Sequence, residues 1–302
     1  MDLKPEMPAT GFDLAPVAPA VGPFPGHQFL SAWWRHLAPP SELVIRTNGH
    51  GLVPLHLTGS ELSLLGDWDH TDYHSPLGVG ADELLAEVLT EVPSGTRFLL
   101  DSLPAEACEV LVAGIERTGA GFQVVDDVAA MVIDLPVSMM AYLDGLDAKQ
   151  RHELRRKRRR YEAEIGPVVH QTHFGAGSGF DEFVRLHRLA PGRKGAFFNN
   201  RRLAFFADLA GQPGWRTDLL AVGGRASACL FGWSDDRHYY LYNSSYDPDQ
   251  KSASPGNVLL MEMIEHSTKQ GWGRFDFLKG TEPYKAQLGA RPRPLYKIEG
   301  RT

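Results

Sequence analysis

Cysteine is scarce in this sequence, and long apolar runs are absent. The 302 residues contain two cysteines, Cys108 and Cys229, which cannot build a disulfide scaffold and form no CxxC metal motif. No stretch of about 18 apolar residues is present, so the sequence predicts no transmembrane helix. Met1–Glu6 is polar and mixed in charge, unlike the start of a secretory signal. We therefore expect a cytoplasmic protein.

The chain carries a small excess of acid, with 31 Lys and Arg against 37 Asp and Glu and a net charge of -6. This balance argues against general binding of polyanions, and we expect no DNA partner. The basic residues are unevenly distributed, however, because the segment Lys149–Arg160 holds eight of them and a single acid, Glu153. That segment carries +7 and leaves -13 on the rest of the chain. The sequence therefore predicts one localised site for a phosphate-bearing partner.

Breaks in composition divide the chain into an arm and two domains. Six prolines within residues 1–25 disfavour helix and central strand, so we predict an extended Pro-rich arm over residues 1–23. Helix and strand patterns alternate in residues 24–137, and the basic segment opens a second domain over residues 138–302. Both halves repeat the order helix, meander, helix and strand. This predicts an α+β protein with a duplicated fold.

The elements of the second domain surround its candidate site. It is predicted to contain an antiparallel meander of three strands, Asp218–Val222, Ala226–Ser234 and His238–Ser244. A helix over Asn257–Gln270 and a strand over Arg274–Leu278 follow. In the first domain, Asn48-Gly49 between two apolar runs predicts a β-hairpin.

Charged side chains cluster around the end of the last predicted strand, in Gly271–Gly289. Ligand sites in α/β architectures lie beyond the carboxyl ends of strands, so these charges mark a candidate active site. A carboxylate of Asp276 or Glu282 would take a proton from an attacking amine, and Lys285 would neutralise a developing oxyanion. The alternative is a surface loop whose charges pair with one another. Two neighbouring side chains are candidates for substrate contact, Lys279 and Tyr284.

Two segments resemble a known enzyme family: YLDGLDAKQRHELRRKRRRYEAEIG, which starts at Tyr142, and SPGNVLLMEMIEHSTKQGWGRFDFLKGTEPYKAQLG, which ends at Gly289. They look like the CelD-like, cellulose-biosynthesis-associated branch of GNAT acetyltransferases. This branch is similar in turn to the FemABX-type aminoacyl transferases, which contain two tandem GNAT-like domains. The resemblance therefore implies tandem GNAT-like domains here, with mixed sheets flanked by helices. Where the family commonly has an acidic residue this sequence has Thr281, which moves the carboxylate role to Asp276 or Glu282.

The resemblance implies an acyltransferase. Its donor would be acetyl-CoA or another acyl-CoA, or else an aminoacyl-tRNA, and its acceptor an amine or hydroxyl in cell-envelope or polysaccharide biosynthesis. GNAT enzymes that use coenzyme A usually have a loop Q/R-x-x-G-x-G/A before a helix, and this sequence lacks it before Asn257. That difference keeps tRNA open as the donor. The alternative function is a non-catalytic binding or assembly factor for a surface-polysaccharide pathway.

Further candidates flank the end of the meander. The third strand offers aromatic walls and hydroxyl donors, and we predict that Tyr242, Ser245 and Tyr246 line the cleft; an aromatic strand packed on the core is the alternative. At the start of the next helix, the backbone N–H groups of Gly256 and Asn257 would hold a pyrophosphate. An ordinary helix cap is the alternative there.

The segment DWDHTDYH, residues 67–74, concentrates three carboxylates and two imidazoles. Adjacent positions in a loop rarely converge on one metal ion, so we expect no metal site. A loop that faces the substrate is the better interpretation, and Asp72 and Tyr73 are its candidate contacts.

The basic segment is predicted to form a helix whose arginines share one stripe. Arg151 and Arg155 lie on this stripe with Arg158 and Arg159. Such a row of guanidinium groups suits the phosphates of a tRNA, a nucleotide-linked sugar or an anionic lipid. The alternative is a solvated helix whose charges pair with acids elsewhere in the chain.

Overall fold

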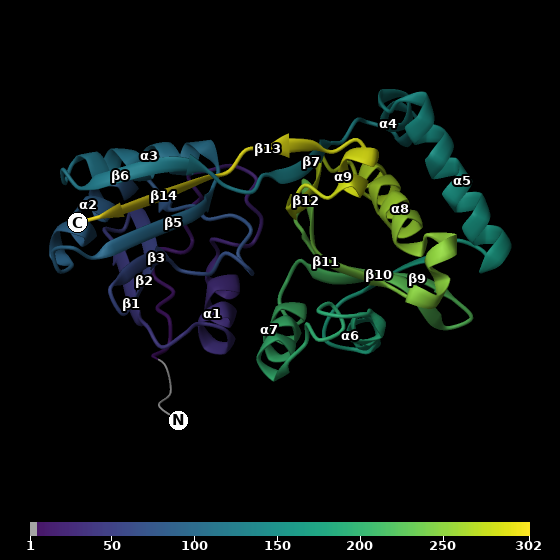
Figure 1. Ribbon diagram of the computed structural model, residues 1–302, viewed down its shortest axis with the longest axis horizontal. Helices are drawn as coiled ribbons and strands as arrows, with labels where there is room; N and C mark the ends of the chain where they lie inside the picture. Colours follow the sequence, from purple (N-terminus) through teal and green to yellow (C-terminus); the bar gives the residue numbers. More distant parts are fainter. Residues whose placement is uncertain (1–4) are drawn as a thin grey trace. The chain divides into compact units, whose positions relative to one another are not determined.

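The computed structural model describes residues 5–302, which fold into two compact units. Unit 1 runs to Ala130 and also contains the C-terminal segment Arg293–Thr302, whereas unit 2 is Met131–Pro292. Each unit is built around its own seven-stranded sheet (Figure 1). Sheets flanked by helices in two units are the α+β architecture that the sequence predicts.

Unit 1 is built from one sheet and the helices packed on it. Its strands are β1 (Glu42–Thr47), β2 (Gly51–Thr58), β3 (Glu61–Leu64), β4 (Leu77–Gly78), β5 (Arg97–Leu103), β6 (Gly121–Asp126) and β14 (Tyr296–Arg301). Its helices are α1 (His27–His36), α2 (Ala81–Glu91) and α3 (Ala105–Glu116). The strand order is β1-β2-β3-β5-β14-β6, with β4 paired to β2. Because β3 and β5 run parallel while the other described pairs run antiparallel, the sheet is mixed.

The predicted hairpin at Asn48-Gly49 is confirmed, since β1 and β2 pair antiparallel on either side of it. The side-chain oxygen of Asn48 accepts hydrogen bonds from the N–H groups of His50 and Gly51, at 3.0 and 2.9 Å. Gly49 has a φ of 85°, a left-handed conformation that glycine adopts without steric cost. Local turn chemistry is therefore enough to form this hairpin.

Unit 2 has its own sheet, with the strand order β13-β7-β12-β11-β10-β9-β8. Its strands are β7 (Ala130–Asp134), β8 (His170–His173), β9 (Trp215–Val222), β10 (Arg225–Ser234), β11 (His238–Tyr246), β12 (Arg274–Lys279) and β13 (Arg291–Arg293). The predicted meander is confirmed as β9, β10 and β11, which pair antiparallel. β12 pairs parallel with β11, which makes this sheet mixed as well.

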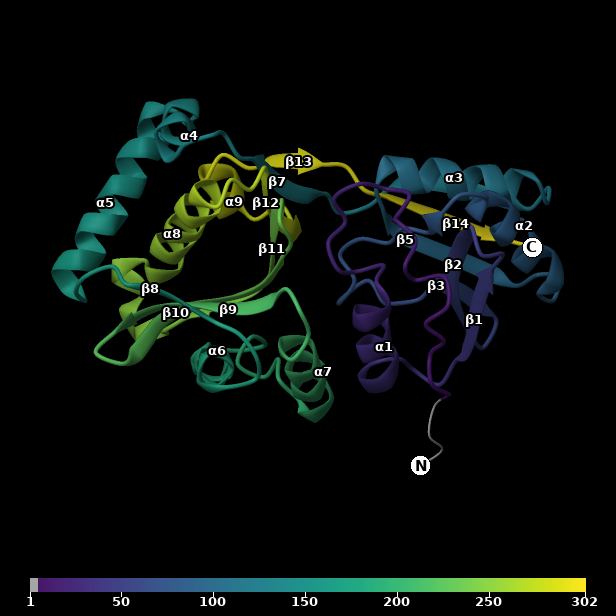
Figure 2. The same ribbon diagram turned by 180° about the vertical axis from the view of Figure 1, so that it is seen from behind.

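Helices cover both faces of the unit 2 sheet (Figure 2). On one face α8 (Pro255–Lys269) packs against β9, β10 and β11, and α4 (Met139–Gly145) and α5 (Ala148–Glu164) pack against α8. On the other face lie α6 (Ser178–Leu189) and α7 (Asn200–Ala210). The 3₁₀ helix η1 (Pro248–Ala253) precedes α8, and α9 (Pro283–Gln287) follows β12. The predicted basic helix is confirmed as α5.

The division into units differs from the predicted domains 24–137 and 138–302 at two strands. β14 lies between β5 and β6 in the sheet of unit 1, and its residue Ile298 is fully buried there. β7, expected at the end of the first domain, instead joins the sheet of unit 2. In both cases the strand, β14 or β7, pairs with strands that are far away in the sequence. Local periodicity carries no information about such pairings.

The predicted extended arm packs on unit 1. The N–H of Val17 donates to the carbonyl of Pro76 at 2.9 Å, and the N–H of Gly78 donates to the carbonyl of Ala15 at 2.8 Å. The side chain of Phe24, just after the arm, is buried as well. Prolines remove donors but keep their carbonyl groups, so this segment can still bond to its neighbours without forming a long strand. Residues 1–4 of the arm lie outside the described residues.

Candidate functional site

The site begins where two parallel strands separate. β11 and β12 pair over only three positions, from His238↔Arg274 to Tyr240↔Asp276, although both strands continue beyond them. Past Tyr240 the sheet is therefore open between the two strands. Gaps beyond the paired carboxyl ends of strands are where α/β proteins bind ligands.

A β-bulge in β11 decides which side chains face this gap. The register between β10 and β11 shifts by one residue, which leaves Tyr242 as the extra residue. Tyr242 and Asn243 consequently both point towards α6 and α7. Tyr242 stacks on Phe206 of α7 with ring centroids 5.3 Å apart, and Oδ1 of Asn243 lies 2.8 Å from Nε2 of His187 on α6.

The end of β11 touches both faces of the sheet. The hydroxyl of Ser245 donates to the carbonyl of Leu186 at 3.1 Å and therefore faces α6. The ring of Tyr246 lies against Gly256 at the start of α8, on the opposite face. Side chains alternate along a strand, which places Ser244 on the same face as Tyr246.

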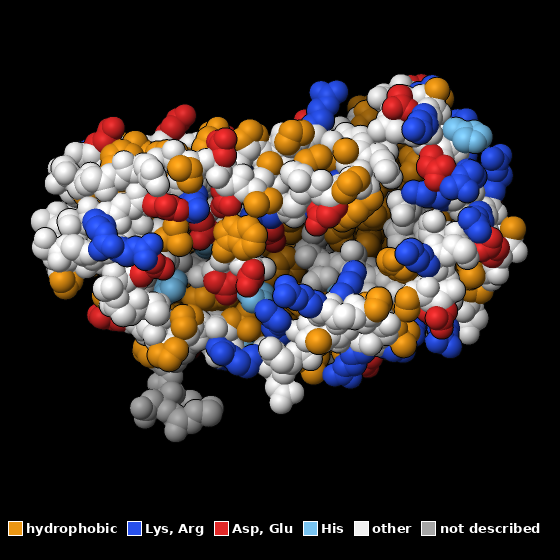
Figure 3. Space-filling view, in the orientation of Figure 1, with side chains coloured by type: hydrophobic (Ala, Val, Ile, Leu, Met, Phe, Trp, Pro, Cys, Tyr) orange, Lys and Arg blue, Asp and Glu red, His pale blue; other side chains and the backbone are white. Residues whose placement is uncertain are grey.

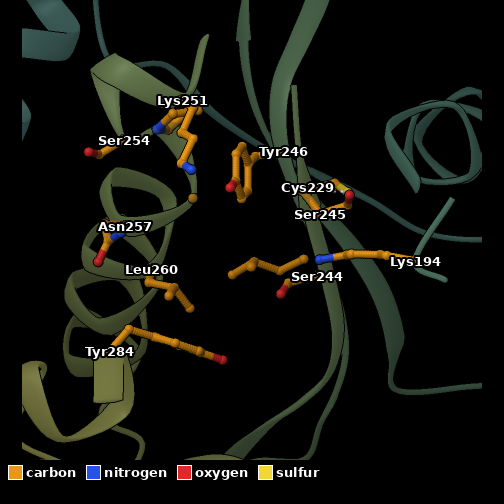
Figure 4. A pocket seen from close by; sticks show the side chains of 13 residues that line it. Lys194, Cys229, Ser244, Ser245, Tyr246, Lys251, Ser254, Asn257, Leu260 and Tyr284 are labelled. Atoms are coloured by element: carbon orange, nitrogen blue, oxygen red, sulfur yellow. Dashed lines mark hydrogen bonds between the residues drawn. The ribbon is translucent and has the colours of Figure 1, made fainter. Parts of the chain in front are cut away.

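A pocket of about 320 Å³ lies at the end of β11, between this strand and α8 (Figure 4). Side chains from both faces of the sheet line it, because Lys194 belongs to the segment between α6 and α7 whereas Asn257 and Leu260 belong to α8. The full lining is Lys194, Cys229, Leu230, Ser244, Ser245, Tyr246, Lys251, Ser254, Pro255, Gly256, Asn257, Leu260 and Tyr284.

The first turn of α8 contributes backbone donors to the pocket. The helix begins at Pro255, after Ser254 in a left-handed conformation with a φ of 55°. The first N–H groups of a helix have no acceptor within it and carry the positive end of the helix dipole. Because Pro255 has no N–H, the groups in question belong to Gly256 and Asn257, and both residues line the pocket. This arrangement suits a phosphate group.

The charge of the pocket is positive. Its lining contains Lys194 and Lys251 but no Asp or Glu. Loss of solvent around the amino group lowers the pKa of Lys194, and burial raises the pKa of the Tyr284 phenol. The phenol therefore stays protonated at neutral pH and can donate a hydrogen bond. Figure 4 shows the Tyr284 oxygen and the Lys194 nitrogen pointing into the pocket from opposite sides.

The predicted catalytic residue Asp276 supports the backbone at the gap. Its side chain is fully buried, and its carboxylate accepts a hydrogen bond from the N–H of Leu278 at 2.7 Å. Leu278 has a φ of 60°, which residues other than glycine rarely adopt, and it lies beyond the last pair with β11. A buried N–H without an acceptor is costly. Asp276 therefore satisfies a group that the separation of the strands sets free.

Lys285 supports the backbone of the following turn by donating hydrogen bonds to its carbonyl groups. Its ammonium donates to the carbonyls of Lys279 at 2.8 Å and Gly280 at 3.0 Å, and it pairs with the carboxylate of Glu282 at 2.9 Å. The Lys285 side chain is buried, whereas that of Glu282 is 55% exposed. These contacts position β12 and α9. None of Asp276, Glu282 and Lys285 lines the pocket, and their part in proton transfer stays a prediction.

Five of the predicted substrate and cofactor contacts come together in the pocket: Ser245, Tyr246, Gly256, Asn257 and Tyr284. Tyr242 and Lys279 do not line it. The bulge turns Tyr242 towards α7, and the carbonyl of Lys279 bonds to Lys285.

The sequence pattern did not indicate Lys194 or Ser244. Lys194 lies in a segment without periodicity between two helices, where neither spacing nor a motif marks it. Ser244 follows the bulge, which reverses the alternation that the sequence would suggest for the strand end.

Asp72 and Tyr73 lie in unit 1. Tyr73 is fully buried, its ring packs against Phe24 with centroids 6.1 Å apart, and the guanidinium of Arg293 lies 4.8 Å from the ring centre. Asp72 beside it is half-buried. The contacts of Tyr73 are those of a core residue, and substrate contact by either residue stays a prediction.

The arginines of the predicted stripe differ in their contacts, since some bond to other parts of the protein and others are exposed. Arg151 donates to the carbonyls of Leu143 and Leu146 and thereby supports the end of α4. Arg158 pairs with Glu262 of α8 at 2.7 Å. Arg155 is exposed and forms no ion pair with any residue from 5 to 302. Lys and Arg side chains gather over α5 at the right edge of Figure 3.

The described part of the chain contains neither a cluster of metal ligands nor a thiol that is ionised at neutral pH. Within residues 5–302, no three or more His, Cys, Asp or Glu side chains gather where they could hold a metal ion. Burial raises the pKa of the Cys229 thiol to about 12, which leaves it un-ionised at neutral pH. No helix among the same residues is long and apolar enough to cross a membrane.

The sequence from α5 to α9 matches a known family. Residues 148–286 fit the family model described as the acetyltransferase (GNAT) domain. This stretch contains every residue that lines the pocket. The match supports the predicted enzyme class, an N-acyltransferase of GNAT type.

Solved structures share the fold over most of the chain. The C-terminal domain of a putative lysylphosphatidylglycerol synthetase from Agrobacterium fabrum aligns with a TM-score of 0.61 at 10% identity, over 90% of this chain and 86% of that one. FemX aligns with a TM-score of 0.59 at 9% identity, over 94% and 92%. A conserved protein of unknown function from Bacteroides thetaiotaomicron aligns with 0.64 at 13% identity, over 97% and 95%. No curated protein matches the sequence. The predicted FemABX-like fold is confirmed.

Replacing Lys285 by Ala should destabilise unit 2. The variant leaves partly buried carbonyl groups without a donor, which should lower the free energy of unfolding by about 2 kcal/mol. Lys269→Ala is the matched control, because Lys269 is exposed and pairs only with Glu265; it should cost less than about 1 kcal/mol. Denaturant unfolding measures both values. Equal stabilities of the two variants would contradict the positioning role of Lys285.

His187 should make stability depend on pH. Burial lowers its pKa from 6.5 to about 4, so the neutral imidazole is favoured in the folded state. The corresponding stability is fully present above pH 6.5 and is lost as the pH falls towards 4, by about 2 kcal/mol at pH 4.5. Unfolding of His187→Gln should show a correspondingly smaller loss between pH 7 and 4.5, and that of the exposed control His152→Gln should not. If the free energy of unfolding depended on pH in the same way in the wild type and in His187→Gln, the predicted contribution of His187 would be wrong.

Proposed function

We propose that unit 2 transfers an acyl group to an amine or hydroxyl in the pocket between the end of β11 and α8. The observation that carries this proposal is a single pocket lined from both faces of the sheet, with a helix start on one face. A donor and an acceptor can therefore reach the same point from opposite sides. Holding two reactants together in this way supports direct transfer, without a covalent enzyme intermediate.

The start of α8 is the proposed place for a phosphate of the donor. Gly256 and Asn257, whose N–H groups have no acceptor within the helix, line the pocket there together with Lys251. The ammonium of Lys157 on α5 lies 3.1 Å from Oδ1 of Asn257, which brings a second cation to this end. Backbone donors, the helix dipole and two lysines together favour a phosphate-bearing donor.

The proposed reaction joins the acceptor to the acyl carbon. The acceptor nitrogen or oxygen forms a bond to the carbonyl carbon, while the bond from that carbon to the donor's sulfur or ester oxygen breaks. The proton lost by the acceptor ends on the departing sulfur or oxygen. Tyr284, which burial keeps protonated, would donate a hydrogen bond to the oxyanion that forms during the attack.

An acyl-CoA and an aminoacyl-tRNA both fit a phosphate-binding helix start, and one observation favours the tRNA. Arg155 and Arg159 lie one turn apart on the exposed side of α5, and neither has an ionic partner among the described residues. Unpaired guanidinium groups suit the phosphates of an extended RNA. The resemblance of Tyr142–Gly289 to the CelD-like branch supports a role in cell-envelope or polysaccharide biosynthesis.

The Tyr284→Phe variant tests the proposed chemistry. Transfer is measured from acetyl-CoA, longer acyl-CoAs and charged tRNA to a panel of amines and alcohols. Loss of one oxyanion donor should lower kcat by about 100-fold with little change in KM. Tyr296→Phe, in β14 of unit 1 and outside the pocket, should keep the wild-type kcat.

An unchanged kcat of Tyr284→Phe would remove Tyr284 from the reaction. If the wild type binds a donor but transfers nothing to any acceptor, the proposed enzyme is wrong. The protein would then be the non-catalytic binding factor.

The double variant Arg155→Ala/Arg159→Ala distinguishes the two donors. With aminoacyl-tRNA it should weaken binding at least tenfold and lower the slope of log affinity against log salt by about 2, because two phosphate contacts are lost. Binding of an acyl-CoA should not change. Wild-type tRNA affinity and salt slope in the double variant would contradict tRNA binding by α5. The control is Arg156→Ala/Arg160→Ala, because those arginines already pair with Glu153 and Glu164.

A further inference from the structure

One cation of the pocket comes from the face opposite to α8. Lys194 lies between α6 and α7, and Figure 4 shows its side chain extending past Cys229 with the nitrogen in the pocket. The phosphate end, with Lys251, Ser254 and Asn257, lies on the far side of Tyr246 in the same view. The two ends of the pocket therefore each carry a lysine.

Within residues 5–302, Lys194 has no anion to pair with. Two other cations of unit 2 each have one: Arg185 lies 2.7 Å from the carboxylate of Glu182, and Arg216 lies 2.6 Å from that of Asp218. Among residues 5–302, no carboxylate is within ion-pair distance of the Lys194 ammonium.

Lys194 is exposed as a residue, and its amino group reaches the pocket, where it has lost part of its solvent. The lining contains no acidic residue, and loss of solvent lowers the pKa of its ammonium. A partly desolvated charge without a counter-ion is unfavourable, and a bound anion relieves that cost.

We propose that Lys194 binds an anionic group of the acyl acceptor, so that the substrate class is an amine or alcohol that also carries a carboxylate or a phosphate. The proposal rests on the proposed function for the identity of this ligand as the acceptor. In the proposed function the start of α8 binds the phosphate of the donor on the other face of the sheet. Lys194 is therefore available to bind the second substrate, the acceptor. Hydroxyl groups of Ser244 and Tyr284 line the space between the two ends.

Binding of an anion at Lys194 fixes where the reacting atom lies. With its charged group held at one end, a small acceptor directs its nucleophile towards Tyr284 and the acyl carbon. An ion pair in a partly desolvated pocket discriminates strongly against a neutral analogue, because the analogue leaves the ammonium unpaired. Lys194 is thus a specificity residue that contacts the substrate.

Acetylation of the intact protein tests anion binding without requiring turnover. The probes are methyl acetyl phosphate, which is anionic, and acetyl N-hydroxysuccinimide ester, which is neutral. Mass spectrometry gives the ratio of the two labelling rates at each lysine. The ratio cancels differences in nucleophilicity between lysines. It should be at least fivefold higher at Lys194 than at Lys269, an exposed lysine that pairs with Glu265.

Competing anions then identify the charged group. At constant ionic strength, inorganic phosphate or acetate should slow labelling of Lys194 by the neutral reagent, and chloride should not. Protection by phosphate alone indicates a phosphorylated acceptor, and protection by acetate indicates a carboxylate. A labelling ratio at Lys194 equal to that at Lys269, or no protection by either anion, would overturn the proposal.

Kinetics of Lys194→Met connect the anion site to the acceptor. The matched acceptors are O-phosphoethanolamine with ethanolamine, and β-alanine with β-alaninamide. The preference in kcat/KM for the anionic member should fall at least tenfold in Lys194→Met and be largely restored in Lys194→Arg. In Lys251→Met, at the donor end, the preference should stay as in the wild type. An unchanged preference in Lys194→Met would refute the proposal, whereas a lack of transfer by the wild type would count against the proposed function alone.

Discussion

The separation of β11 from β12 is the constraint on which the site depends. Two parallel strands that stop pairing inside a protein leave backbone groups without partners, and each must find another. At the end of β12 the carboxylate of Asp276 accepts a hydrogen bond from the N–H of Leu278. The ammonium of Lys285 donates hydrogen bonds to carbonyl groups of the turn that follows. These side chains keep the gap open without leaving the backbone unsatisfied. The strands can separate here because neighbouring side chains form hydrogen bonds with the backbone groups that lose their partners in the sheet.

The properties of the pocket follow from the elements around this gap. The bulge in β11 turns Tyr242 and Asn243 to one face and returns Ser244 to the other, so the strand end contributes to both. α8 begins at the pocket, and residues of its first turn line it. With two lysines and no carboxylate, the lining of the pocket is positively charged although the chain as a whole carries -6.

The sequence predicts the elements of this fold better than their pairing or the geometry of the site. The meander, the basic helix and the hairpin at Asn48-Gly49 have local signals, and the structure contains all three. β14 pairs with strands far away in the chain, for which periodicity gives no signal. The charges of Asp276 and Lys285 led the sequence analysis to predict a site at the end of β12, and neither side chain lines the pocket. Their contacts depend on a positive φ at Leu278 and on strand separation, which residue types do not reveal.

Amide hydrogen exchange at the start of α8 tests the central claim most directly. The N–H groups of Gly256 and Asn257 have no acceptor within the helix, so they should exchange rapidly in the free protein. Saturating coenzyme A or deacylated tRNA, whichever binds, should slow exchange at these two positions at least tenfold, together with smaller protection around Tyr284. Binding that protects other segments and leaves Gly256 and Asn257 unchanged would contradict a donor site at the gap between β11 and β12.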